Sequence, residues 1–335
     1  MTLEVVSRPT TSLAQLSTSA PLQTRPKPRR HVLDLDDFSA QEIETVLQTT
    51  AAMKDVLQRP IKKVPTLRGK TLVTLFYEAS TRTRVAFELA AKALGADTVS
   101  VAAQSSSVTK GESLIDTIRT LQALGADFVV MRHHQAGAPY VVADEVSASV
   151  INAGDGWHAH PTQALLDLFT IRERLGRIAG LRVAIIGDVL HSRVARSNLW
   201  GLTLMGANVV LCGPPTLLPK PSFCEGLPWS FERTYHLEEA LDGADVIMLL
   251  RMQLERQAGG LFPSLREYVR TYALTEERLA HAKPGAVVMH PGPMNQGVEI
   301  DPRVARSAQS VIETQVTNGV AVRMALLYLL SGLPA

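Results

Sequence analysis

The chain has little cysteine and almost no net charge. Only Cys212 and Cys224 occur in 335 residues, and no Cys-x-x-Cys pair or cluster of histidines and cysteines accompanies them. Such sparse cysteine indicates a reducing compartment, for which we expect the cytoplasm, and gives no sign of a metal site. The formal net charge of +2 is too small to favour nucleic acid as a partner, so any strong positive field must be local.

Long apolar runs are also missing. No run approaches the roughly 20 residues of a membrane helix, because even the apolar C-terminal segment carries Arg323. We therefore expect no association with a membrane. Hydrophobic residues make up 46% of the chain and charged residues 20%, which is typical of a soluble globular protein of about two domains.

Residues 1–30 differ from the rest. They are rich in Ser, Thr and Pro and contain one acid, Glu4, which predicts a flexible N-terminal extension. A transit peptide is the alternative, since such segments are also poor in acids. Order is expected from about residue 31, and a capping box at Ser39 to Glu42 predicts a helix that runs to about Leu57.

From Lys70 onward, short apolar runs alternate with helical segments. This alternation predicts an α/β fold with two doubly wound domains, each with a central parallel sheet flanked by helices. Two groups of four strands are expected, divided near residues 165–180 and bridged by a helix at 160–174. A last helix at about 311–330 is apolar enough to pack across the first domain. The strands are expected near 71–76, 98–102, 127–131, 149–152, 182–186, 207–212, 245–250 and 286–289.

The stretch from Phe76 to Arg84 (Phe-Tyr-Glu-Ala-Ser-Thr-Arg-Thr-Arg) follows the first of these strands. Ser80 is the expected N-cap of the next helix, whose first turn carries free amides, two hydroxyls and a guanidinium. A helix start of this kind after a buried strand suits a phosphate dianion, because ligands of open α/β sheets bind at the carboxyl ends of strands. The alternative is a capped helix with two solvated arginines.

Five further segments place polar residues after apolar runs. Each has an ordinary interpretation as a solvated loop, a turn or a structural histidine. For the segment that follows the strand at 183–186, a dinucleotide-binding site is a further interpretation. It is disfavoured because the Gly-x-Gly-x-x-Gly spacing is absent. The segments are the polar loop 105–113, Arg132 at a strand end, His160-Pro-Thr-Gln163, Gly187-Asp188 with Arg193, and Arg251-x-Gln253-x-Glu-Arg; a Pro-Gly-Pro turn at 291–293 follows the last strand.

Together these segments resemble the aspartate and ornithine carbamoyltransferases over about residues 31–332. The stretch 76–84 resembles their carbamoyl-phosphate motif, and His-Pro-Thr-Gln followed by Ala-Leu-Leu-Asp-Leu is among the most specific matches. The Arg251 segment resembles the aspartate members, whereas the His-Cys-Leu-Pro and Asp-x-x-x-Ser-Met-Gly segments of ornithine enzymes are absent. Gln296 departs from the pattern, since the family has arginine there.

The resemblance implies an enzyme that transfers the carbamoyl group of carbamoyl phosphate to L-aspartate in pyrimidine synthesis, without a cofactor or metal. It implies an extension at 1–30, a carbamoyl-phosphate domain at 31–165 completed by a helix at 309–335, and an aspartate domain at 166–308. The implied catalytic residues are Arg82, Thr83, His160 and Lys110. Those implied to bind carbamoyl phosphate are Ser80, Thr81, Arg82, Thr83, Ser106, Arg132, His160, Gln163, Gly292 and Pro293, and those for aspartate are Lys110, Arg193, Arg251 and Gln253.

The resemblance also implies a homotrimer in which Ser106 and Lys110 reach the site of a neighbouring subunit. Higher assembly with regulatory or dihydroorotase-like chains is possible in such a family. A cis bond is expected between Gly292 and Pro293, because an X-Pro bond costs only about 0.5–1 kcal/mol to hold in cis. Two alternatives stay open: an enzyme of this fold that carbamoylates another amine, and a catalytically silent scaffold subunit.

Overall fold

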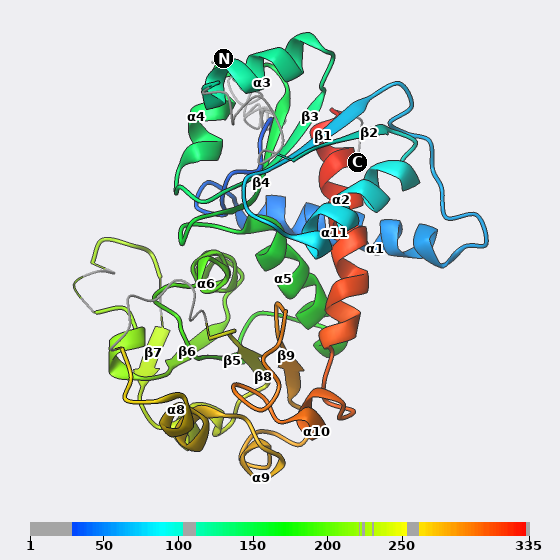
Figure 1. Ribbon diagram of the computed structural model, residues 1–335. Coiled ribbons are helices and arrows are strands. Elements are labelled where there is room, and N and C mark those ends of the chain that lie inside the picture. Colours follow the sequence, from blue (N-terminus) through cyan, green and yellow to red (C-terminus); the bar gives the residue numbers. More distant parts are fainter. Residues whose placement is uncertain are drawn as a thin grey trace, which may run out of the picture.

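The computed structural model describes residues 29–102, 112–220, 222, 225–229, 231–252 and 261–332. Within these ranges the chain forms two α/β domains joined by a long helix, α5 (Pro161–Leu175) (Figure 1). The predicted fold class is confirmed. No helix among the described residues is both long and apolar enough to cross a bilayer.

The first domain holds a four-stranded parallel sheet in the order β2-β1-β3-β4. Its strands are short apolar runs, and β1 is buried over five of its six residues. The predicted capping box opens the first helix, since the Ser39 and Glu42 side chains each accept from the other residue's backbone N–H. The elements are α1 (Ala40–Gln58), β1 (Thr71–Phe76), α2 (Thr81–Ala93), β2 (Asp97–Ala102), α3 (Leu114–Ala123), β3 (Phe128–His133), α4 (Ala138–Glu145) and β4 (Ser149–Asp155).

The second domain holds a five-stranded parallel sheet in the order β7-β6-β5-β8-β9. The prediction of four strands here was wrong, because β7 (Phe231–Thr234) pairs at the edge beside β6 with two of its four residues exposed. The other elements are β5 (Arg182–Ile186), α6 (Arg193–Leu204), β6 (Asn208–Cys212), η3 (Pro215–Leu217), α7 (Leu237–Leu241), β8 (Val246–Leu249), α8 (Leu265–Tyr272), α9 (Glu276–Leu279), β9 (Val287–Met289) and α10 (Pro302–Ala305).

The last helix, α11 (Ile312–Leu330), returns to the first domain and packs against α1, α2 and α5 (Figure 1). Its residues Ala321, Val322 and Met324 are fully buried in the same apolar cluster as Leu47 of α1 and Phe87 of α2. The expected packing of this helix is confirmed. Segments from both ends of the described chain therefore share one core.

Both sheets reverse their strand order at a central pair, β1/β3 in the first and β5/β8 in the second. In open parallel sheets, ligands bind outside the carboxyl ends of the strands at such points. The fold thus offers one binding position in each domain, and the turns that follow these four strands are where site residues should gather.

Candidate functional site

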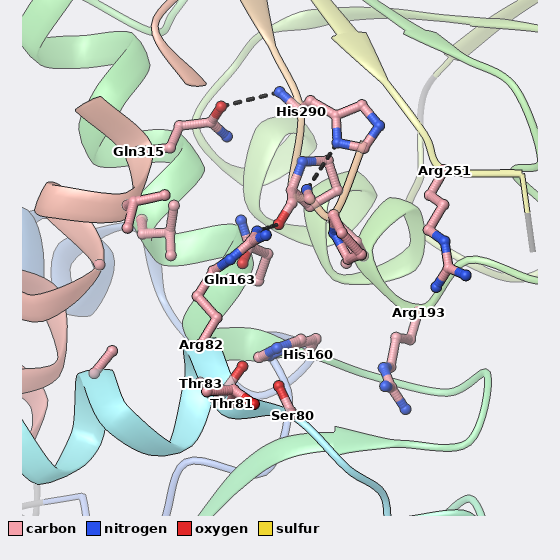
Figure 2. A pocket seen from close by; sticks show the side chains of 18 of the residues that line it. Ser80, Thr81, Arg82, Thr83, His160, Gln163, Arg193, Arg251, His290 and Gln315 are labelled. Carbon is pink, nitrogen blue, oxygen red and sulfur yellow. Dashed lines mark hydrogen bonds between the residues drawn. The ribbon is translucent and has the colours of Figure 1, made fainter. Parts of the chain in front are cut away.

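A cavity of about 640 Å³ lies between the two domains (Figure 2). It is bounded by the turns after the central strands of both sheets, by the start of α5 and by one face of α11. Its lining residues are Ala79, Ser80, Thr81, Arg82, Thr83, Ala86, Arg132, His160, Gln163, Leu166, Ser192, Arg193, Val194, Leu250, Arg251, His290, Pro291, Gly292, Pro293, Gln315, Val316, Gly319 and Arg323.

The first domain presents the start of α2 to this cavity. Ser80 is the N-cap, as predicted, although its side chain makes no capping hydrogen bond, so its hydroxyl is available to a ligand. Arg132 lies beside this turn because Phe76 and Arg132 are partners in the β1/β3 register. Arg84 instead points to the surface, 3.9 Å from Glu88, and has the ordinary role of a half-exposed cation.

The second domain contributes two arginines at its own point of strand reversal. Arg193 is the first residue of α6, after β5, and Arg251 follows β8, the neighbour of β5. Figure 2 shows both side chains on one side of the cavity, with the start of α2 on the other. Arg193 is buried and donates from Nη1 to the carbonyl of Gly156 at 3.0 Å.

A turn after β9 closes the cavity. The Gly292–Pro293 peptide bond is cis, as the sequence predicted. Arg82 Nη1 donates to the Pro291 carbonyl at 2.5 Å, which connects the start of α2 with this turn. Gly292 has φ +64°, and a Cβ at this position would lie 2.0 Å from Arg82 Nη1. Only glycine lets the backbone approach the guanidinium this closely.

His160 and Gln163 stand at the start of α5. The backbone N–H of His160 donates to Ser197 Oγ at 2.9 Å, and Ser197 Oγ donates to Asp34 Oδ1 at 2.7 Å. Gln163 Nε2 donates to Asp167 Oδ1 at 3.0 Å, so its Oε1 remains as the acceptor for the cavity. His158 lies outside the lining and its Nδ1 pairs with Asp155 Oδ2 at 3.0 Å, so its role is structural.

The lining is strongly cationic. Five arginines reach the cavity, and no lining residue that the structure describes is Asp or Glu. Burial lowers the pKa of Arg82, and burial together with the charge of Arg82 lowers the pKa of Arg323 to about 10. Arg323 therefore still carries its charge at neutral pH. A site of this kind favours small anions with more than one negative charge.

All predicted site residues within the described ranges line this one cavity: Ser80, Thr81, Arg82, Thr83, Arg132, His160, Gln163, Arg193, Arg251, Gly292 and Pro293. Ser106, Lys110 and Gln253 lie outside the described residues. The roles assigned to all of them stay predictions.

Among the residues that sequence reasoning missed, four carry a charge, an amide or an imidazole at or beside the cavity. His290, Gln315 and Arg323 line the cavity, and Glu78 bonds Arg193. Glu78 lies inside the segment 76–84 and His290 directly precedes the turn at 291–293, so both could have been found as charged or aromatic neighbours of assigned residues. Gln315 and Arg323 are two of the few polar residues that are buried in the largely apolar helix α11, which was a usable signal.

Comparisons with known proteins agree on one family. Residues 30–173 match the model of the aspartate/ornithine carbamoyltransferase carbamoyl-P binding domain, and residues 179–330 match that of the Asp/Orn binding domain. The aspartate carbamoyltransferase catalytic subunit of Roseiflexus sp. (strain RS-1) is 67% identical over 304 residues, covering 91% of this chain and 96% of that protein.

Solved structures give the same relationship. The aspartate transcarbamoylase of Trypanosoma cruzi, in complex with carbamoyl phosphate and aspartate, matches with a TM-score of 0.82 and 30% identity, over 89% of this chain and 96% of that one. The ornithine carbamoyltransferase of Pyrococcus furiosus matches with a TM-score of 0.82 and 32% identity, over 91% of this chain and 98% of that one.

Proposed function

The chain belongs to the aspartate/ornithine carbamoyltransferase family, and from this we infer that it transfers the carbamoyl group of carbamoyl phosphate to the α-amine of L-aspartate. The products are N-carbamoyl-L-aspartate and phosphate, and the reaction serves pyrimidine synthesis. The observation that carries the assignment to this cavity is its lining, which holds five arginines and, among the described residues, no carboxylate. Carbamoyl phosphate is a dianion and aspartate brings two carboxylates.

The phosphate of carbamoyl phosphate fits the start of α2. The helix dipole, the backbone amides and the hydroxyls of Ser80, Thr81 and Thr83 favour an anion there, and Arg82 and Arg132 supply charge. Several cations around one site are favourable once the dianion is bound, because it supplies the compensating charge. Ser106 and Lys110 of a neighbouring subunit complete this site in the proposed homotrimer.

The carbamoyl carbonyl lies among donors and its amine among acceptors. His160, Arg82 and Thr83 hydrogen-bond the oxygen, on which negative charge develops in the transition state. Gln163 Oε1 and the backbone carbonyls of the 291–293 turn accept from the amine. These opposite sets of partners hold the planar group in one orientation, so that its carbon faces the second domain.

Arg193 and Arg251 hold the carboxylates of aspartate, since the planar guanidinium can grip a carboxylate through two hydrogen bonds. Gln253 and Lys110 complete this set. The unprotonated α-amine attacks the carbamoyl carbon, a tetrahedral intermediate forms, and the C–O bond to phosphate breaks. The leaving phosphate takes up the proton that the amine loses. Positioning and charge stabilisation supply the rate without a covalent enzyme intermediate.

A steady-state assay of the full chain with carbamoyl phosphate and either aspartate or ornithine tests the proposal. We expect turnover with aspartate at least a hundredfold above that with ornithine. An Arg251→Gln variant should lose activity through a raised KM for aspartate, whereas Arg84→Gln, which changes a surface arginine, should stay within twofold. Faster turnover with ornithine would overturn the substrate assignment, and no turnover with either amine would favour the silent scaffold.

A mass measurement in solution tests the proposed trimer. We expect three copies of the chain, in the cytoplasm, as the working unit. Regulatory or dihydroorotase-like chains that join the trimer in a cell extract would appear as added mass. A monomer at working concentration would contradict shared sites.

A further inference from the structure

A single buried carboxylate, that of Asp167, lies behind the cavity at the meeting point of three helices. Asp167 is on α5 and is fully buried. Its Oδ1 accepts from Gln163 Nε2 at 3.0 Å and from Gln315 Nε2 of α11 at 2.8 Å, and its Oδ2 accepts from Asn198 Nδ2 of α6 at 2.9 Å. Asp167 does not line the cavity itself.

We propose that Asp167 is a positioning residue that sets both groups of acceptors facing the carbamoyl amine: Gln163 Oε1 on one side and the turn of residues 290–293 on the other. This inference rests on the proposed function. Asp167 would then control recognition of the carbamoyl amine but not of the phosphate, although Asp167 itself contacts neither group.

The first branch runs through Gln163. An amide side chain can place either its NH2 or its oxygen toward a neighbour, and the two orientations have nearly the same shape. A carboxylate only accepts, so Asp167 selects the orientation in which Nε2 of Gln163 points inward. The oxygen of Gln163 is then left to face the cavity as an acceptor.

The second branch runs through Gln315. Because its Nε2 donates to Asp167, its Oε1 faces the other way and accepts from the backbone N–H of His290 at 2.9 Å (Figure 2). His290 Nδ1 in turn accepts from the N–H of Gly292 at 2.8 Å, and its Nε2 lies 3.1 Å from Glu299 Oε1. The Asp167 carboxylate therefore fixes the start of the turn indirectly, because it sets the orientation of the Gln315 amide that accepts from His290.

The electrostatic surroundings keep Asp167 an acceptor at neutral pH. Burial raises its pKa to about 6, while the three amide donors and the charge of Arg323 on α11 oppose that rise. The carboxyl is thus ionised at pH 7 and above. Its buried charge is balanced by Arg323, which also lines the cavity.

The test compares two acyl phosphates that differ at one group. Acetyl phosphate carries a methyl group where carbamoyl phosphate carries its amine, so the ratio of their Kd values reports recognition of the amine alone. We expect the wild type to prefer carbamoyl phosphate, and Asp167→Ala to lower this preference at least tenfold while affinity for inorganic phosphate changes less than threefold. Kinetic assays should show a lower kcat with carbamoyl phosphate.

Asn198→Ala is the matched control, because it removes a donor to the same carboxylate but touches neither glutamine. It should lower the melting temperature as Asp167→Ala does and keep the preference within threefold. If Asn198→Ala lost as much of the preference for carbamoyl phosphate as Asp167→Ala does, Asp167 would have only a packing role. Preference retained in Asp167→Ala would overturn the proposal outright.

A rescue variant covers the case in which Asp167→Ala does not fold. In Asp167→Asn combined with Asn198→Ala, the asparagine can turn its oxygen to both glutamines and its NH2 into the space left by Asn198. We expect the preference to stay within threefold of Asn198→Ala alone, and its loss would refute the acceptor role. A wild type without any preference would instead count against the proposed function.

Discussion

Glu78 of the first domain forms an ion pair with Arg193 of the second, with 2.9 Å between Oε2 and Nη2. The same oxygen lies 3.3 Å from Nε of Arg132. Glu78 follows β1, whereas Arg193 begins α6, so one carboxylate joins arginines that the proposed function assigns to different substrates. This ion pair holds Arg193 of the second domain next to the turn that leads into α2 of the first domain.

Glu78→Gln should therefore raise the KM for aspartate about tenfold, because Arg193 loses a charged partner in a largely buried position, a difference of about 1.4 kcal/mol. The KM for carbamoyl phosphate should change less, since Arg132 keeps its bond to the Ala153 carbonyl. Steady-state kinetics with each substrate varied in turn measure both. Glu88→Gln, at a surface ion pair, is the control. Equal changes in the two KM values would contradict the separate roles of the arginines.

Gly292→Ala should weaken carbamoyl-phosphate binding on the order of tenfold or more, because the new Cβ displaces the Arg82 guanidinium. Its positive φ adds a backbone cost of about 1 kcal/mol to stability. Gly297→Ala separates the two effects, since Gly297 also has a positive φ but open space around its Cβ position. It should lose similar stability and keep its affinity. Calorimetric titration and denaturant unfolding measure the two quantities, and equal affinity losses would refute the role of the Arg82 contact.

The strands were predictable because buried parallel strands are continuous apolar runs, as in Val183 to Ile186. The edge strand β7 was not, since half of its residues face solvent and carry charge. The residues that line the site could be predicted from the sequence where they lie in a polar segment that directly follows an apolar strand. The pairings that support these residues could not be predicted, because Glu78 meets Arg193 across 115 residues and Asp167 meets Gln315 across 148, and no local pattern encodes such pairs.

The proposed sharing of active sites between subunits predicts complementation between two defective chains. Arg82→Ala alone should lose about 3 kcal/mol of transition-state stabilisation, roughly a hundredfold in kcat/KM, because the oxyanion and the leaving phosphate both lose a donor. Lys110→Ala should be similarly poor. Mixed trimers of the two would contain sites with neither defect, so activity should reappear after subunits exchange. Hybrids that form, as shown by native mass spectrometry, and stay inactive would exclude a shared site.

The buried carboxyl of Asp34 should make stability depend on pH. Burial raises its pKa to about 6, so between about pH 4 and pH 6 the folded state binds more protons than the unfolded state. Its contribution to stability is therefore fully present below pH 4 and lost as pH rises through 6. Relative to Asp34→Asn, the wild type should lose up to about 3 kcal/mol of unfolding free energy between pH 4 and pH 7.5. Urea unfolding across this range measures the difference, and a constant difference would show that Asp34 titrates normally.

The return of α11 to the first domain sets an order for folding during synthesis. The second domain is translated whole before α11 emerges, whereas the first domain lacks the helix that covers α1, α2 and α5 until residues 312–330 have been made. Domains generally fold as units, and N-terminal ones first. Here the first domain must wait, with the apolar faces of its helices unburied, for residues that are made only after the whole second domain. A chain that stops before residue 312 would therefore have a folded second domain and a first domain whose apolar core residues are still exposed. Such a chain would be a natural target for chaperones.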